Sequence, residues 1–540
     1  MVAIIFPLYT KCLKSIFTKC SMDMLDRVVK EGETSDSEDE SDFLLFRERP
    51  NKGMFPSAYA TSYITEKRFA AKYGHKIKKI FLIQKGDRSR TVGIRKSDFK
   101  TIAKKMLDET LKNPTYISSI YQESNSSALR LVEFTHDNQD LNSKTNSELF
   151  QLYKRFGELY TDFQFTNVPA WFILAEEFSN YLMDYLAEST DQKQAREALV
   201  ILTTPTDPSY VRRQDLGLIN IIKKIQENKE PMSVFKQYKE ADIKERLAKS
   251  IIYADIQLHA EEFKWIPFDY IGPDLWDVGH FIKEIEIFIQ QGKQTEEELE
   301  KLRKQDESLK KLQWELKEQF DIDDSIYRLF KDMGLIMLLQ DVKKEFSTKS
   351  HVWLQTKLLP EISRRINIET RLLRNLTEEE FSSLLLNNAK FDPVLLKKRE
   401  EYSVLIAEEG RFSVLLDEEA KEYDLKFSVS FSDLDIIKGN IASLGKARGK
   451  ARVLLNKDDI GKVQEGDIIV ATMTTPDYVP AMKKAVGIVT DEGGVTCHAA
   501  IVSRELGIPC IIATGIATKV FKDGEEIEVD AVHGIVKKIK

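Results

Sequence analysis

The spacing of apolar residues changes twice along this chain of 540 residues, and each change predicts a different kind of structure. Two short apolar runs at 80–83 and 91–94 flank a polar turn and predict a β-hairpin. Helical spacing follows from residue 98 to about residue 112 and stops before Pro114. We therefore expect residues 43–130 to form a small module of helices and strands.

Apolar residues then recur at helical spacing from about residue 147 to residue 409. The clearest helices are expected at 148–165, 171–187, 244–263, 282–290, 296–320 and 325–346. Thr295 and Glu298 match a capping box at the start of the most charged of these helices. That helix could be a coiled-coil arm between two copies of the chain or a solvated helix, so a homo-oligomer stays open. We expect residues 131–430 to form a helical domain.

Strand patterns return toward the C-terminus and alternate with short helical segments. The expected strands lie near 449–455, 467–471, 486–490, 509–513, 526–530 and 535–539. They predict a compact α/β domain at 431–540, and the Ser, Asp, Gly and Asn residues of 427–444 mark the candidate hinge before it. The expected fold class is therefore multidomain α+β, with a largely helical central domain followed by a compact α/β domain.

Composition narrows the possible partners. The chain has 80 Lys and Arg residues against 87 Asp and Glu residues, which gives no electrostatic reason to expect nucleic acid. No apolar run approaches the ~20 residues that span a bilayer, so no membrane partner is expected. Residues 1–42 end in an acidic, small-residue run and are expected to be disordered. Four cysteines are too few for a disulfide framework and favour a cytoplasmic location.

The residues with the clearest chemistry lie at 491–509, in the sequence DEGGVTCHAAIVSRELGIP. Gly493 and Gly494 follow an apolar run and permit a tight turn. Thr496 can cap a helix that runs from about residue 497 to residue 506, and Gly507 at the C′ position, with Pro509 two residues on, would end it. His498 would then stand on the first helical turn, where unpaired backbone N–H groups and the helix dipole favour an anion.

A histidine in this setting can carry phosphorus. Neutral imidazole is a nucleophile, and a large share of an ordinary histidine is neutral near pH 7. Ala499 and Ala500 are small and would leave the approach to His498 open. The residues alone thus predict a histidine that accepts a phosphoryl group and passes it on.

The same stretch resembles the swivelling phosphohistidine domain of the phosphoenolpyruvate (PEP)-utilising enzymes, which include pyruvate phosphate dikinase, phosphoenolpyruvate synthase and rifampin phosphotransferases. The resemblance covers about 436–540, with further matches at 466–470 and 475–477. The matching motif residues are Gly493, Gly494, Thr496, Cys497, His498, Ala499, Ala500, Arg504, Glu505, Gly507, Pro509, Ala517, Thr518, Asp523 and Gly524.

The resemblance implies roles for several of these residues. His498 would be the covalent phosphoryl carrier, and Thr496 would hydrogen-bond its ring or the phosphate. Arg504 would pair with phosphate or, equally well, form a structural salt bridge. Cys497 occupies a place where the family has Ser or Cys, so we expect it to support the phosphate loop and not to act as a nucleophile. His533 is expected to be a turn residue.

A second candidate site interrupts the helical region between residues 259 and 276. It contains the aromatic residues Trp265, Tyr270 and Trp276 together with His259, on a backbone expected to be irregular. With the segment at 202–205, it resembles the substrate domain of rifampin phosphotransferases, which would make it a pocket for the phosphoryl acceptor. The alternative is an aromatic packing seam. His259 also shares a helix face with Asp255 and Glu262, but a polar surface explains these three better than a metal site does.

The match to the family is incomplete. Residues 43–430 show no Gly-rich phosphate loop of an ATP-grasp domain, and no pyruvate-binding barrel follows the histidine domain. Three interpretations stay open. In the first, the chain is a phosphotransferase component that a separate ATP-grasp protein charges and that passes phosphate to a small-molecule acceptor. It could exchange phosphate with another donor, or be a non-catalytic binding or regulatory protein that keeps the domain as a scaffold. In the first interpretation ATP and Mg²⁺ act through the partner, and no metal site is expected in this chain.

Overall fold

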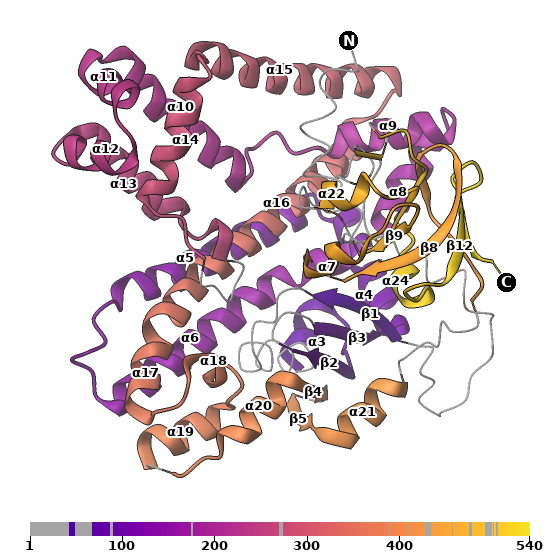
Figure 1. Cartoon of the computed structure of the whole chain (residues 1–540). Helices are drawn as coiled ribbons and strands as arrows, with labels where there is room; N and C mark the ends of the chain where they lie inside the picture. Colours follow the sequence, from indigo (N-terminus) through magenta and orange to yellow (C-terminus); the bar gives the residue numbers. More distant parts are fainter. Residues whose placement is uncertain are drawn as a thin grey trace. The chain divides into compact units, whose positions relative to one another are not determined.

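The computed structural model describes residues 43–48, 67–86, 90–173, 176–268, 274–387, 389–408, 410–426, 434–455, 457–472, 474, 478–491, 499, 502–503 and 506–539. Its backbone contacts divide the chain into two units, one of residues 37–427 and one that contains residues 428–540. Figure 1 labels the helices and strands of both. Each unit is described here by itself.

A five-stranded antiparallel sheet organises the start and the end of the large unit. Its order is β1 (Phe43–Glu48), β3 (Arg90–Arg95), β2 (Lys79–Lys85), β4 (Tyr402–Glu408) and β5 (Arg411–Leu415). The expected hairpin is present as β2 and β3, with Phe81 opposite Gly93. A side chain at Gly93 would collide with the Phe81 ring, so this glycine is what lets the two strands pair.

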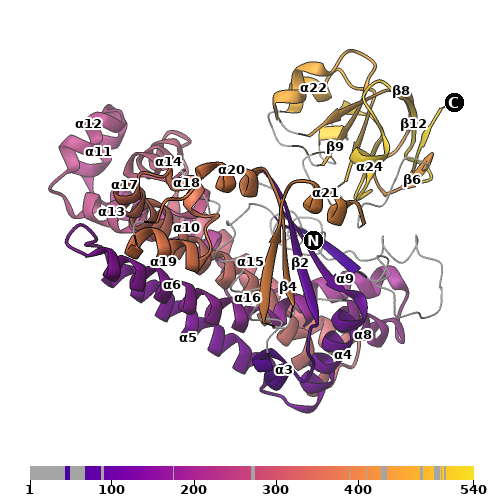
Figure 2. The same cartoon turned by 90° about the horizontal axis from the view of Figure 1, so that it is seen from below.

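The five-stranded sheet contains strands from both sides of the domain boundary that was expected at residue 130. Strands β4 and β5 come from the stretch that helical spacing assigned to the helical domain, yet β4 pairs with β2 along its whole length, as Figure 2 shows. The physical reason is that β4 carries the buried apolar residues Val404, Leu405 and Ala407. By pairing with β2, the strand covers what would otherwise be an exposed sheet edge. Helix α5 (Tyr116–Asp137) also runs through the expected boundary.

The remainder of the described large unit is helical. Its first helices are α3 (Lys67–Tyr73), α4 (Lys96–Lys112), α5, α6 (Asn146–Asn167), α7 (Pro169–Ile173), α8 (Glu176–Ala187), α9 (Gln192–Thr203), α10 (Tyr210–Glu227), α11 (Lys229–Gln237), α12 (Glu240–Leu247), α13 (Ile251–Phe263) and α14 (Val278–Gln290). They continue as α15 (Thr295–Gln319), α16 (Asp324–Trp353), α17 (Leu359–Ile366), α18 (Thr370–Leu373), α19 (Glu378–Asn387), α20 (Pro393–Glu401) and α21 (Asp417–Lys426). The 3₁₀ segment Ile266–Phe268 follows α13, and a π-helical turn, Leu354–Leu358, joins α16 to α17.

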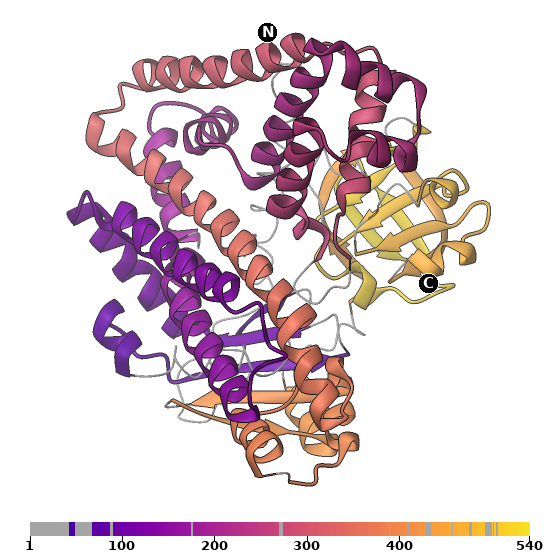
Figure 3. The same cartoon turned by 90° about the vertical axis from the view of Figure 1, so that its left-hand side faces the viewer.

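Two apolar cores hold these helices together. One lies where the long α16 packs along α5 and near α6, an arrangement visible in Figure 3, and includes Phe156, Tyr160 and Trp353. The other lies among α10 to α14 and includes Ile222, Ile256 and Phe281. Both follow from apolar residues that recur at helical spacing on one face.

The expected capping box at the most charged helix is wrong. Helix α15 begins at Thr295 itself, with Gln294 at the N-cap position and no side-chain cap. The Thr295 hydroxyl instead donates to Oε1 of Gln226 on α10 at 2.8 Å. A tertiary hydrogen bond has therefore replaced the local one. Whether α15 joins two copies of the chain stays a prediction.

The C-terminal unit contains an eight-stranded sheet in the order β6-β13-β12-β8-β9-β10-β11-β7. The strands are β6 (Ile436–Lys438), β7 (Asn440–Ser443), β8 (Lys446–Leu454), β9 (Ile468–Ala471), β10 (Gly487–Thr490), β11 (Cys510–Ile512), β12 (Glu526–Asp530) and β13 (Ile535–Lys538). Strands β8 to β11 are mutually parallel. Short helical segments are η5 (Lys457–Lys462), α22 (Val479–Met482) and α24 (Ala517–Val520).

Part of the expected hinge is instead a pair of strands. Strands β6 and β7 are consecutive in the chain but lie at opposite ends of the strand order. The chain therefore passes from one edge of the sheet to the other at Gly439. A Cβ atom at Gly439 would lie 2.7 Å from the Ile512 carbonyl oxygen, which explains the glycine at this close approach. Residues 427–433 of the expected hinge lie outside the described residues.

Candidate functional site

The histidine motif follows the carboxyl end of β10, in the middle of the four parallel strands. Ligands of parallel sheets commonly bind at this edge. Of the predicted site residues in this motif, the structure describes Ala499, which is buried. The others lie outside the described residues: Gly493, Gly494, Thr496, Cys497, His498, Ala500 and Arg504. Their geometry, and with it the predicted role of each, stays a prediction.

Asp491 is the first residue of this motif, and the structure describes its contacts. Its backbone N–H donates to the Ala471 carbonyl oxygen at 3.0 Å, and its side chain is only 7% exposed. Its Oδ1 accepts from the Thr514 hydroxyl and from the Thr518 backbone N–H, each at 3.2 Å, and Oδ2 accepts from the Thr518 hydroxyl. One carboxylate therefore joins the end of β10 to the turn after β11 and to the start of α24.

The electrostatics of Asp491 combine two opposing effects. Burial raises the pKa of the carboxyl above its usual value, and the hydrogen bonds from Thr518 and Thr514 partly oppose that rise. A buried carboxylate with several donors is a rigid anchor, because each donor would be left unsatisfied without it. The motif that carries His498 thus begins at a fixed point.

The other side of the motif is anchored by packing. Ala499 and Val502 are buried in the core of the C-terminal unit, and Leu506 packs against it, at the spacing of one helix face. The Ile508 N–H donates to the Ser503 carbonyl oxygen at 3.0 Å, and Gly507 has φ +67°. This is the Schellman closure predicted from Gly507 and Pro509.

Among the described residues of the predicted acceptor pocket, His259 and Trp276 both pack on Phe281, with ring centroids 4.9 and 5.7 Å apart, and Trp265 packs elsewhere. Trp265 is buried, donates from Nε1 to the Glu262 carbonyl oxygen at 2.8 Å and packs on Tyr210 with ring centroids 5.0 Å apart. Trp276 stacks on His280 at 4.2 Å. Tyr270 lies outside the described residues. Each of the two tryptophans is therefore engaged in aromatic packing within the helical unit.

His259 does line a hollow. An open space of about 300 Å³ lies between α10 and α13, with His259 in its wall beside Asp255 and Glu262. The two carboxylates are each paired with lysine, Asp255 with Lys224 and Glu262 with Lys349, both at 2.7 Å. Within the described ranges no group of three or more His, Cys, Asp or Glu side chains is arranged to hold a metal ion.

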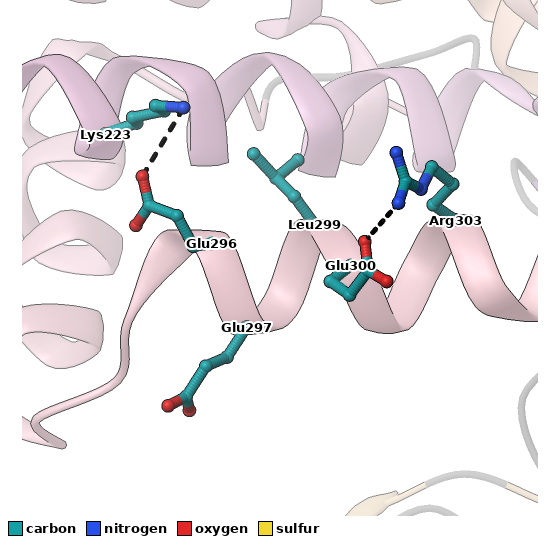
Figure 4. A pocket seen from close by; sticks show the side chains of 6 residues that line it. All are labelled: Lys223, Glu296, Glu297, Leu299, Glu300 and Arg303. Carbon is teal, nitrogen blue, oxygen red and sulfur yellow. Dashed lines mark ion pairs between the residues drawn. The ribbon is translucent and has the colours of Figure 1, made fainter.

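A larger hollow of about 520 Å³ lies between α10 and the start of α15 and is drawn in Figure 4. Lys223 pairs there with Glu296 at 3.4 Å, and Arg303 pairs with Glu300 at 2.7 Å. These are exposed pairs on helix surfaces, and such pairs contribute little. We assign no chemistry to them.

Sequence reasoning missed Asp491, Thr514 and Thr518 as a group. Asp491 directly follows a buried strand and opens the histidine motif, and Thr518 belongs to a matched motif further on. The two signals are 27 residues apart, and nothing local links them. Only the parallel pairing of β10 with β11 brings them together.

Comparisons with known proteins concern this same unit. Residues 463–534 match the family described as PEP-utilising enzyme, mobile domain. The probable phosphoenolpyruvate synthase of Archaeoglobus fulgidus is 56% identical over 116 residues, 22% of this chain and 15% of that protein. The phosphoenolpyruvate synthase of Pyrococcus furiosus is 57% identical over 103 residues, 19% of this chain and 13% of that protein.

The matched part thus spans only about 13 to 15% of these relatives. Among solved structures, aconitase X of Thermococcus kodakaraensis is 21% identical and covers 19% of this chain and 98% of that chain. The TM-score of this match is 0.17.

The sequence comparisons place residues 463–534 with the mobile domains of the PEP-utilising enzymes. The C-terminal unit is a mobile domain of the PEP-utilising enzymes, and phosphoenolpyruvate synthases are among its relatives. None of the described helices is long and apolar enough to cross a membrane.

Proposed function

We propose that this chain carries a phosphoryl group on His498 and transfers it to a small-molecule acceptor. The observation that supports this most is the match of residues 463–534 to the mobile domain, which includes the complete motif around His498. Asp491 at the start of the motif and the core residues Ala499 and Val502 further along it are buried. A loop fixed at both of these places is consistent with a binding or catalytic role.

The chemistry has two balanced steps. Neutral His498 attacks the terminal phosphorus of a donor, so that an N–P bond forms and the bond from phosphorus to the donor's leaving oxygen breaks. A hydroxyl oxygen of the acceptor then attacks that phosphorus, the N–P bond breaks, and the hydroxyl proton passes to solvent. Thr496 and Arg504 are proposed to hydrogen-bond and neutralise the phosphoryl oxygens.

The donor is proposed to be ATP, held with Mg²⁺ by a separate ATP-grasp protein. The acceptor is proposed to bind in the helical unit near His259, with Trp265, Tyr270 and Trp276 as the wider aromatic surroundings. The competing function is a binding or regulatory protein in which His498 is never phosphorylated.

The test is transfer of label from γ-labelled ATP in the presence of a separately expressed ATP-grasp protein. We expect one acid-labile phosphate per chain, absent in His498→Gln. His533→Gln is the matched control, because His533 is an exposed histidine of the same unit, with Nδ1 2.9 Å from Oδ2 of Asp530. Label that persists in His498→Gln would contradict the proposal. No label on the wild type with an active partner would favour the scaffold function.

A further inference from the structure

A strongly basic stretch stands out in this acidic chain. Residues 67–105 contain 14 Lys and Arg residues and 2 Asp and Glu residues, whereas the whole chain has a net charge of −7. The stretch includes α3, the hairpin of β2 and β3, and most of α4. A local excess of positive charge of this kind attracts a partner of the opposite charge.

Three of these cations form a ridge along one face of α4. Lys96, Lys100 and Lys104 are spaced four residues apart, so their side chains follow one another along the helix. Lys100 and Lys104 are exposed, and Lys96 is half-buried. No carboxylate of the described residues forms an ion pair with any of the three, and the Asp98 carboxylate is already 2.8 Å from Nε2 of His75. We call these three residues the α4 lysine ridge.

The ridge is unfavourable for the helix that carries it. Like charges four residues apart on a helix repel each other. Lys96 and Lys100 also stand in the first turns of α4, where the helix dipole disfavours a cation, and the N-cap residue Arg95 provides no side-chain hydrogen bond. An acidic partner on this face would relieve both kinds of repulsion.

The sequence supplies such a partner directly before β1. Residues 31–42 contain seven Asp and Glu residues and no Lys or Arg, and they lie outside the described residues. They end one position before Phe43, which pairs with Arg95 across β1 and β3. The Arg95 guanidinium lies 5.7 Å from the centre of the Phe43 ring, and Lys96 follows it in the chain. The acidic segment is therefore joined to the described chain beside the first residue of the ridge.

The length of the segment is sufficient for contact along the whole ridge. From Lys96 to Lys104 a helix rises about 12 Å. Residues 38–42 carry four of the seven acids, and five extended residues reach about 17 Å. A short tether also holds a group near its target at an effective concentration of about 1 mM, which favours it over a free competitor.

We propose that the acidic segment 31–42 docks on the α4 lysine ridge of the same chain and shields it from other polyanions. The contact is electrostatic and lies at the surface, so it weakens as salt rises. The inference goes beyond the proposed function and does not depend on phosphoryl transfer by His498.

Zero-length cross-linking of the full chain with a carbodiimide tests the contact, because this reagent joins a carboxylate to a lysine Nζ only where the two touch. A mixture of ¹⁴N- and ¹⁵N-labelled chains separates bonds within one chain from bonds between two copies. We expect bonds within one chain from the peptide that contains residues 31–42 to Lys100 or Lys104. Their yield should fall at least about fivefold in about 0.5 M salt. Bonds to the ridge only between copies, or none at all, would overturn the proposal.

Shielding is tested with a single-stranded oligothymidylate as the competing polyanion. Replacing the seven acids of the segment with Asn and Gln should tighten its binding at least about fivefold at low salt. The gain should vanish when the three ridge lysines are also changed to Gln. The matched control changes Lys304, Lys310 and Lys311 instead, three exposed lysines of α15, and the gain should persist there. Equal binding by the wild type and the neutralised segment, or a gain that survives without the ridge, would contradict shielding by this segment.

Discussion

Replacing Asp491 with alanine should loosen the base of the histidine motif. The carboxylate of Asp491 accepts from the Thr518 backbone N–H, the Thr518 hydroxyl and the Thr514 hydroxyl. Asp491→Ala removes both acceptor oxygens and with them all three hydrogen bonds. The two hydroxyls can turn elsewhere, and that of Thr514 already donates to the Thr490 carbonyl oxygen at 3.1 Å. The Thr518 N–H has no such freedom.

The expected cost follows from these contacts. The orphaned donor is the Thr518 N–H at the start of α24, so losing this bond also uncaps the helix, and we expect a total cost of about 1–3 kcal/mol. Asp491→Asn keeps one acceptor oxygen and removes the cost of a buried charge. We therefore expect the asparagine variant to stay within about 1 kcal/mol of the wild type.

Hydrogen exchange on the full chain measures this locally, without assuming that the two units unfold together. We expect amides of β10, β11 and α24 in Asp491→Ala to exchange about 5- to 140-fold faster than in the wild type. Asp491→Asn should change them only a few-fold. Exchange near the wild-type rate in Asp491→Ala, or equal damage by both variants, would refute the anchoring role.

Three further predictions concern the large unit. Gly217→Ala should destabilise it by about 1–3 kcal/mol in urea unfolding, because the added Cβ atom would overlap the His259 ring; an unchanged midpoint would contradict that packing. Gln313→Ala should cost about 1–2 kcal/mol, because its Nε2 donates to two carbonyl oxygens at the end of α9, at 2.8 and 2.9 Å; Gln319→Ala, at the end of the same helix, is the control. Two arginines hold the pKa of Glu361 at about 2, so its stabilisation is present above pH 4.5 and is lost as pH falls toward 2. The difference in stability between wild type and Glu361→Gln should therefore shrink over that pH range, and a constant difference would contradict the assignment.

Six of the eight strands of the C-terminal unit, β8 to β13, could be predicted because each contains apolar residues at strand spacing between turn residues. The same criterion failed for β4, since its buried run lies between helices and resembles another helical stretch. Strands β6 and β7 were also missed. β6 pairs with β13 and β7 with β11, and pairings of such long range leave no local pattern.

The candidate sites show the same limit. The closure at Gly507 could be predicted because it depends on neighbouring residues. The aromatic residues after His259 are close in sequence, but their packing partners could not be predicted, since Trp265 packs on Tyr210 and Trp276 on His280. His259 and Gly217 likewise meet only because α13 packs against α10.

The central claim is tested most directly by mass spectrometry of the chain isolated from its own cells under alkaline conditions. The account predicts a single phosphoryl group on the peptide that contains His498, lost after brief acid treatment and retained in base. Full coverage of that peptide with no phosphoryl group in actively growing cells, or a phosphate that survives acid, would contradict it.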